Sequence, residues 1–144
     1  SIKLEVNIDE TKIPTPTPTH TPTPTPSVLP AKLDLQLSQN HFVPGDNFSL
    51  VLVIESKGLP SIVHPVCLTF EAMGQYFFFP DWSDEFETAG IVIDKQYTII
   101  NVMDFEWPET NFSGRGFCFH AVILTHDLKK ISSNIDSVSF GWDG

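Results

Sequence analysis

The sequence has few basic residues, only two cysteines and no long apolar run. Lys and Arg total 8 against 18 Asp and Glu, for a formal net charge of -10, so the surface repels phosphate backbones and nucleic acid is not an expected partner. No stretch approaches the roughly 18 to 20 apolar residues of a membrane-spanning helix. Hydrophobic residues nevertheless make up 41% and aromatic residues 12% of the chain, which predicts a soluble, core-forming domain and excludes a disordered chain.

The sequence also lacks catalytic signatures: no GxSxG, P-loop, HExxH or EF-hand pattern is present. No recurrent zinc spacing links the histidines to one another or to a cysteine. We therefore expect no enzyme, no metal at the histidines and no cofactor. The histidines are His20, His41, His64, His120 and His126.

Proline is abundant in only one place, and it divides the chain. Seven of the 12 prolines lie in residues 13–30, which read IPTPTPTHTPTPTPSVLP. We expect three parts: an N-terminal strand at 1–12, a Thr-Pro linker at 13–30 and a β-sandwich domain at 31–144. The chain begins at Ser1 without Met or a signal-peptide pattern, so we expect a processed product or a segment of a longer chain.

The Thr-Pro tract predicts an extended spacer. Alternating proline excludes helix and sheet and favours polyproline II, so residues 14–26 span on the order of 40 Å, longer than the roughly 30 to 35 Å width of the body. Such a tract suits either an ordinary hinge between domains of a secreted protein or a spacer between subunits. Its threonines are candidate O-glycosylation sites: Thr15, Thr17, Thr19, Thr21, Thr23 and Thr25.

The first eight residues alternate between apolar and polar side chains, which predicts a half-buried β-strand. The apolar side chains are Ile2, Leu4, Val6 and Ile8. A lone strand is not stable in water, so another sheet must receive it: that of its own body, of a preceding domain or of a neighbouring copy. We favour the third, donor-strand exchange, because a stiff linker longer than the body suits an intramolecular strand poorly.

From residue 32 onward, short alternating segments are separated by turn residues, and only residues 127–131 suggest a single helical turn. This pattern predicts an all-β fold, an antiparallel Ig-like or Greek-key β-sandwich of about eight strands. An N-terminal extension strand and a polyproline II linker precede it. The expected strands are 32–38, 48–55, 62–72, 75–79, 91–94, 97–103, 116–124 and 137–142.

Two pairs of residues are candidates for covalent modification. Cys67 and Cys118 lie within apolar strand patterns, and in an extracellular protein they would form a disulfide. Two buried free thiols are the alternative. Asn47 and Asn111 begin N-x-S sequons at predicted turns or strand starts, which makes them candidate N-glycosylation sites.

The richest polar region follows the aromatic strand 75–79. Its acids could bind calcium, which takes several oxygen ligands. Alternatively, the region could bind a sugar, with Trp82 or Tyr76 stacking on a pyranose face and the acids accepting hydrogen bonds from its hydroxyl groups. The third alternative is a solvated acidic loop that buries its tryptophan. The residues concerned are Tyr76, Asp81, Trp82, Asp84, Glu85 and Glu87.

The order of alternating strand (Ile2, Leu4, Val6, Ile8), linker and β-sandwich resembles fibre subunits assembled by donor-strand complementation, such as chaperone-usher pilins and archaeal bundling-pilus subunits. Those pilins usually have a shorter connection than this Thr-Pro tract. Separately, residues 32–142, with PGD, YFFFPDW and FEWP segments, resemble an uncharacterised β-sandwich module found behind Thr/Pro linkers in secreted bacterial proteins. That resemblance implies an extracellular setting and supplies no activity.

These observations lead to two functional hypotheses. In the first, the chain is a secreted, cell-surface structural glycoprotein that polymerises with copies of itself into a pilus-like filament by donor-strand exchange. In the second, it is a secreted carbohydrate-binding or adhesive module that the linker tethers to another domain. The partners would be further copies of the chain in the first case and glycans in the second.

Overall fold

The structure is a computed structural model that describes residues 29–144. The predicted donor strand, with Ile2, Leu4, Val6 and Ile8, and the linker threonines lie outside the described residues. Within the described part, every regular element is a β-strand. The strands are β2 (Ala31–Leu37), β3 (His41–Phe42), β4 (Asn47–Ser56), β5 (Ile62–Ala72), β6 (Gln75–Phe78), β7 (Ala89–Ile93), β8 (Tyr97–Glu106), β9 (Gly114–Ile123) and β10 (Asp136–Trp142).

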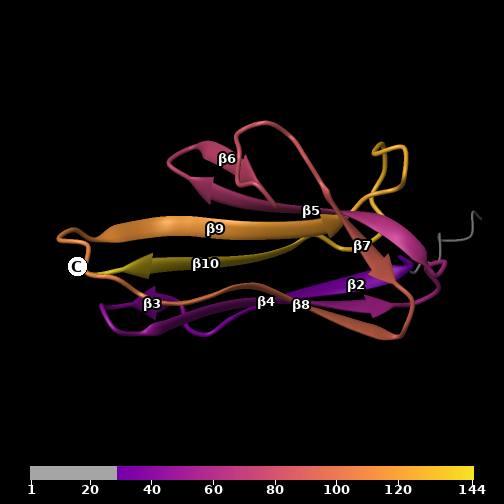
Figure 1. Cartoon of the computed structure of the whole chain (residues 1–144). Helices are drawn as coiled ribbons and strands as arrows, with labels where there is room; N and C mark the ends of the chain where they lie inside the picture. Colours follow the sequence, from indigo (N-terminus) through magenta and orange to yellow (C-terminus); the bar gives the residue numbers. More distant parts are fainter. Residues whose placement is uncertain (1–28) are drawn as a thin grey trace, which may run out of the picture.

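The strands form two facing sheets, which confirms the predicted β-sandwich (Figure 1). The larger sheet has the order β3-β10-β9-β5-β6, with β7 also paired to β5, and the smaller has the order β2-β4-β8. All pairs are antiparallel except β3 with β10. This order is immunoglobulin-like, but in the constant-type arrangement a fourth strand lies beside the equivalent of β8. In this protein β7 pairs with β5 instead.

The core lies between the sheets and follows from the alternation of each strand. In β4 the side chains of Phe48, Leu50, Leu52 and Ile54 are at most 1% exposed, because every second residue of a strand points to the same face. They meet apolar side chains of the larger sheet, among them those of Leu68, Phe119 and Ile123. Each such side chain contributes about 1.5 to 3 kcal/mol when it is fully buried.

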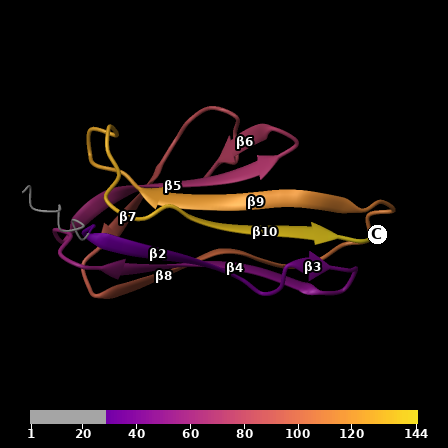
Figure 2. The ribbon, with the colours of Figure 1, turned by 180° about the vertical axis from the view of Figure 1, so that it is seen from behind.

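One side of the sandwich is closed by hydrogen bonds between β2 and the start of β10 (Figure 2). The Asn134 side chain accepts from Leu33 N–H at 2.7 Å and donates to its carbonyl at 3.1 Å. The Asp136 carboxylate accepts from Leu35 N–H at 2.6 Å. These side chains satisfy backbone groups that an open edge would leave to solvent or to another chain.

The structure corrects two details of the expected elements. Residues 127–131 form no helical turn, because Thr125 and Asp127 hydrogen-bond backbone N–H groups within this connection and hold it as an irregular turn closed by a bridge between Leu124 and Ile131. The two-residue strand β3 was not predicted, since two residues are too short for an alternation to appear.

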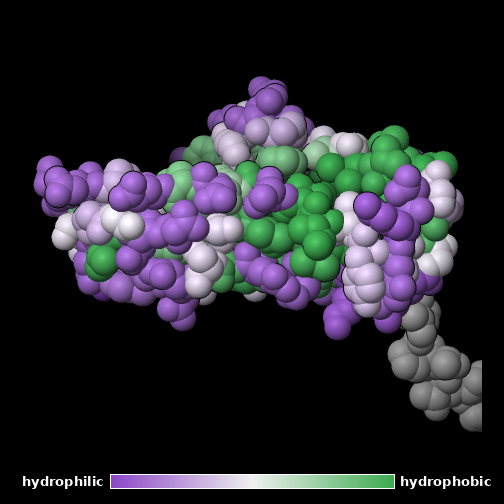
Figure 3. Space-filling view, turned by 60° about the horizontal axis from the view of Figure 1, so that its bottom comes forward, coloured by the Kyte–Doolittle hydropathy of each residue, from purple (hydrophilic) through white to green (hydrophobic). Residues whose placement is uncertain are grey.

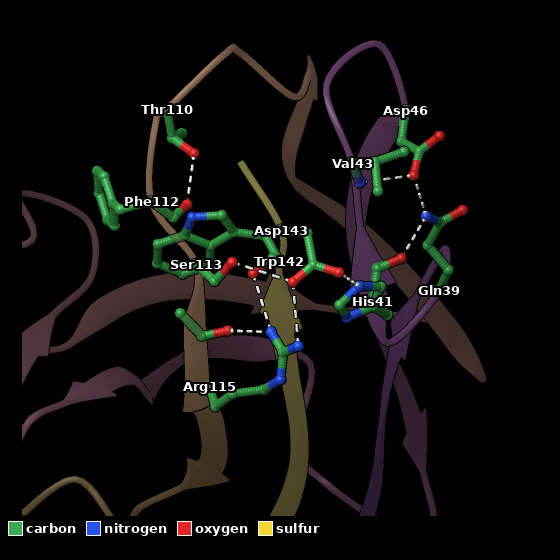
Figure 4. Close-up of polar contacts among 11 residues, drawn as sticks. Gln39, His41, Val43, Asp46, Thr110, Phe112, Ser113, Arg115, Trp142 and Asp143 are labelled. Carbon is green, nitrogen blue, oxygen red and sulfur yellow. Dashed lines mark hydrogen bonds and ion pairs between the residues drawn. The ribbon is translucent and has the colours of Figure 1, made fainter.

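A polar cluster around Asp143, just after β10, connects the end of β10 to β3 and to the start of β9 (Figure 4). The Asp143 carboxylate lies 2.9 Å from His41 Nε2, accepts from Ser113 Oγ at 3.0 Å and pairs with Arg115 Nη2 at 3.1 Å. Arg115 Nη1 also donates to the Trp142 carbonyl at 2.9 Å. The hydrogen bonds from Arg115, His41 and Ser113, in that order, lower the pKa of Asp143 from its ordinary 3.8 to about 2.

We predict that Asp143 stabilises the fold only while it is ionised. Because the pKa is lower in the folded state, its contribution is complete above about pH 4 and is lost as the pH falls towards 2. Asp143→Asn should therefore lower the free energy of unfolding at pH 6. The difference in this free energy between the variant and the wild-type protein should disappear between pH 4 and pH 2. Urea unfolding at a series of pH values measures the difference in the free energy of unfolding and its dependence on pH. Asp94→Asn, at an exposed turn, is the control, and a difference that is independent of pH would contradict the prediction.

Candidate functional site: an open strand edge over an aromatic groove

Within the described residues, β8 is hydrogen-bonded to one strand only, β4, and its other edge is open. The N–H of Ser56 donates to the carbonyl of Gln96 at 2.8 Å, and this bond fixes the alternation of the β4–β8 ladder. Backbone groups of Ile100 therefore point towards β4, whereas those of Ile99 and Asn101 point to the open edge. β8 thus presents a template along which another strand can pair.

The inner face of β8 is only half covered. Phe105 lies opposite Phe48 and Met103 lies opposite Leu50; yet Phe105 is 41% exposed while Phe48 is 1% exposed. The smaller sheet is therefore one strand too narrow to cover the larger sheet at this edge.

An apolar groove of about 370 Å³ lies where this cover is missing. Residues of both sheets and two loop tryptophans line it with aromatic rings and one methionine. From the side of the three-stranded sheet, hydrophobic residues gather midway along the molecule and at one end (Figure 3). The groove is lined by Phe48, Phe70, Phe77, Trp82, Met103, Phe105, Trp107, Phe119 and Phe140.

The aromatic rings that line the groove pack on one another. Phe48 stacks on Phe105 with ring centroids 4.9 Å apart, and Phe119 stacks on Phe140 at 5.7 Å. Trp82 meets Phe119 edge to face at 6.0 Å. Such pairs are worth about 0.5 to 1.5 kcal/mol each beyond the area they bury, so the floor of the groove is preformed.

The acidic loop after β6 contains most of the residues predicted to bind calcium or a sugar. Trp82 points inward and lines the groove, and Glu87 Oε2 accepts from the N–H of Asp81 at 3.1 Å. No three of the carboxylates of Asp81, Asp84, Glu85 and Glu87 lie within 4.8 Å of one another, and calcium binding by this loop stays a prediction. Tyr76 lies beside His120 and is 48% exposed, whereas Trp82 lines the groove. Stacking of a sugar on either ring stays a prediction.

The predicted disulfide is not formed: Cys67 and Cys118 are both free. Cys67 lies opposite Val122 on β9, and Cys118 lies opposite Glu71 on β5. Val122 and Cys118 are four residues apart on β9, so the two cysteines are displaced along the strands by about 13 Å at 3.3 Å per residue. This displacement exceeds the Cα separation that a disulfide spans. Burial raises the pKa of both thiols, and for Cys118 the Glu71 carboxylate adds to this effect.

The two sequon asparagines lie at the surface. Asn47 is exposed at the first position of β4, and Asn111 is exposed in the connection before β9. Both positions leave room for a glycan, and N-glycosylation there stays a prediction.

A second hollow, of about 660 Å³, lies between β2 and β10. Although it is larger, it is less suited to an apolar partner because polar side chains contribute to its lining, among them Gln36, Gln39 and Asn40. Side-chain hydrogen bonds from Asn134 and Asp136 already occupy part of this edge of β2. The groove beside β8 is therefore the stronger candidate site.

Comparison with known proteins does not assign the chain to a group. No protein-family model matches it, and no curated protein matches it in sequence. Within residues 29–144, the structure contains no helix with the length and apolar character needed to cross a bilayer.

Sequence reasoning missed two features. The first is the open edge of β8, for which the signal was the apolar run of Ile99, Ile100, Val102 and Met103, since a strand that is apolar on both faces needs more cover than one sheet gives. The second is that Cys118 and His120 are two residues apart and therefore share a face of β9. The expectation that no cysteine lies at a ligand spacing from a histidine overlooked this pair.

We predict that hydrogen exchange will reveal the open edge. In the monomeric protein, the amides of Ile99 and Asn101 should exchange about tenfold or more faster than the amide of Ile100, because only the last is bonded to β4. Residue-resolved exchange measured by NMR tests this. Equal protection of these three amides would mean that another segment of the same chain covers the edge.

Proposed function

We propose that the chain is a structural subunit that assembles with copies of itself by strand complementation. The strand of residues 1–8 from one copy lies along β8 of the next, and its apolar side chains fill the aromatic groove. The observation that carries the proposal is the unpaired edge of β8 beside a groove with an entirely apolar lining. The exposed sequon asparagines and the Thr-Pro tract support an extracellular or cell-surface setting for the assembly.

The chemistry and the dimensions of the two partners agree. Eight residues of strand extend about 27 Å and the ten residues of β8 about 34 Å, so the donor fits within the edge. Burying four large aliphatic side chains contributes on the order of 6 to 10 kcal/mol before ordering costs. The donor presents one apolar face and one polar face, as a strand between a groove and solvent requires.

Charge favours an antiparallel orientation of the donor on β8. Asp104 and Glu106 lie opposite Ser49 and Asn47, on the outer face near the end of β8. Lys3 lies on the polar face near the start of the donor. An antiparallel arrangement brings Lys3 close to these two acids, and opposite charges on neighbouring strands stabilise the pair.

The linker favours a second copy over the same chain as the partner. Ala31 lies opposite Ser56 and Tyr97 lies opposite Glu55, so the described chain starts at the same end of the sheet as β8. Two strand spacings, about 10 Å, separate β2 from β8. An extended tract on the order of 40 Å long is much longer than the distance from β2 to β8 in the same chain. Its length suits a connection between two subunits.

The carbohydrate-binding alternative is less favoured. Recognition of a sugar needs polar groups beside an aromatic face, and this groove is lined by rings and a methionine. Trp82, one of the two rings proposed for stacking, packs against Phe79 and Phe119. An apolar strand matches the groove better than a hydroxylated ligand does.

We predict that the inward side chains of residues 1–8 drive assembly. Leu4→Asp with Val6→Asp should weaken association about 100-fold or more, because two charges replace side chains that enter the groove. Sedimentation velocity over a range of protein concentration measures the change. The matched control is Lys3→Ser with Glu5→Ser, on the outward face of the same strand, which should change association by less than about tenfold.

Mixing two defective chains tests the pairing itself. The Leu4→Asp, Val6→Asp chain keeps its groove, and a Met103→Arg chain keeps its strand but has a charge in the groove. Each should be monomeric alone, and together they should form a one-to-one complex. Circular dichroism verifies that both remain folded. Assembly of the first chain alone, or no complex from two folded chains, would refute the proposal.

A further inference from the structure

Three side chains with metal-binding atoms meet on the outer face of the larger sheet, away from the groove. They are Glu71 on β5 and Cys118 and His120 on β9, and their ligand atoms lie within 4.8 Å of one another. The backbone register produces this arrangement: Cys118 is directly opposite Glu71, and His120 follows Cys118 by two residues and so points to the same face. All three side chains are partly exposed, so solvent reaches them.

Hydrogen bonds hold the imidazole of His120 from both sides. Its Nε2 lies 2.8 Å from Glu71 Oε1, and its Nδ1 lies 2.7 Å from Ser137 Oγ on β10. Ser137 is directly opposite His120, so three adjacent strands contribute to the cluster. Ligand histidines in metal sites are commonly oriented in this way, with the second ring nitrogen bonded to a neighbouring oxygen.

The donor set is that of a zinc-class ion. Thiolate, imidazole and carboxylate together suit Zn²⁺, whereas Ca²⁺ and Mg²⁺ prefer oxygen ligands alone. Around a tetrahedral Zn²⁺ the ligand atoms are roughly 3.5 Å apart. His120 Nε2 and Glu71 Oε1, now 2.8 Å apart, therefore have to separate by about 0.7 Å, and Cys118 Sγ, within 4.8 Å of them, has to approach by at most about 1.3 Å, both through side-chain rotation. The strands that carry the ligands are central ones, paired on both edges, and give a rigid frame for such a site.

We propose that Glu71, Cys118 and His120 bind one Zn²⁺-class ion, with water in the fourth position. His120 Nε2 and the Glu71 carboxylate exchange their mutual hydrogen bond for bonds to the metal. In the metal-bound form the ring proton lies on His120 Nδ1 and is donated to Ser137 Oγ, which makes Ser137 a positioning residue. This site does not depend on the proposed mode of assembly.

Metal affinity and thiolate formation are linked at this site. Burial, and to a smaller degree the nearby Glu71 carboxylate, raises the pKa of the Cys118 thiol. A divalent ion reverses that effect and displaces the proton on binding. Binding should therefore release protons and strengthen as the pH rises.

The test is titration of the full chain, reduced and treated with chelator, with Co²⁺ and with Zn²⁺. We expect one equivalent of Co²⁺ to bind with a thiolate-to-metal charge-transfer band in the near ultraviolet, and Zn²⁺ to displace it. Cys118→Ser should abolish the band, and Glu71→Gln and His120→Gln should each weaken binding about 100-fold. Ser137→Ala should weaken it about tenfold and leave the band in place.

Cys67 provides the matched control. It is the other free thiol, it lies in β5 and is buried, so Cys67→Ser should leave the stoichiometry and the band unchanged. In the wild-type chain, Zn²⁺ should slow alkylation of Cys118 by iodoacetamide, a measurement that requires no variant to fold. Absence of saturable binding would overturn the proposal. Loss of the band in Cys67→Ser would overturn it as well. So would an affinity that neither Glu71→Gln nor His120→Gln changes.

Discussion

The unequal width of the two sheets is the constraint on which the rest of the structure depends. Because β7 pairs with β5 and not with β8, the smaller sheet ends one strand short, and the inner side chains of the larger sheet extend past it. On the opposite side, Asn134 and Asp136 join β2 to the start of β10. Side-chain hydrogen bonds therefore close one side of the sandwich, and the other side has an open edge over aromatic rings. In the proposed assembly, this difference directs an added strand to one place.

Much of the fold follows from local sequence. Alternation in β2 and β4 places Leu33, Leu50 and Leu52 inside, and turn residues separate the strands, so the sandwich class and most strand positions were predictable. The pairing of β7 was not, since its five residues carry an apolar face that fits beside either β5 or β8. That choice depends on competition between whole sheets, and it decides whether the edge of β8 is open.

The candidate sites were less predictable because their residues meet only across strands. Trp82 was recognised in a polar loop, but whether its ring faces solvent or the groove depends on its distant contact with Phe119. Cys118 lies opposite Glu71 and not Cys67, so the register that excludes a disulfide also creates the mixed-ligand cluster. Such registers are set by hydrogen-bond ladders and not by local pattern.

The central claim is that residues 1–8 of one copy pair with β8 of another, and the most direct measurement is an isotope-filtered NOE experiment. In a mixture of ¹³C-labelled and unlabelled chains, only contacts between copies are detected. We expect NOEs from the methyl groups of Leu4 and Val6 to the Met103 methyl and the Phe105 ring. NOEs from those methyl groups solely within one copy, or to Leu37 and Val138 beside the hollow between β2 and β10, would contradict the claim.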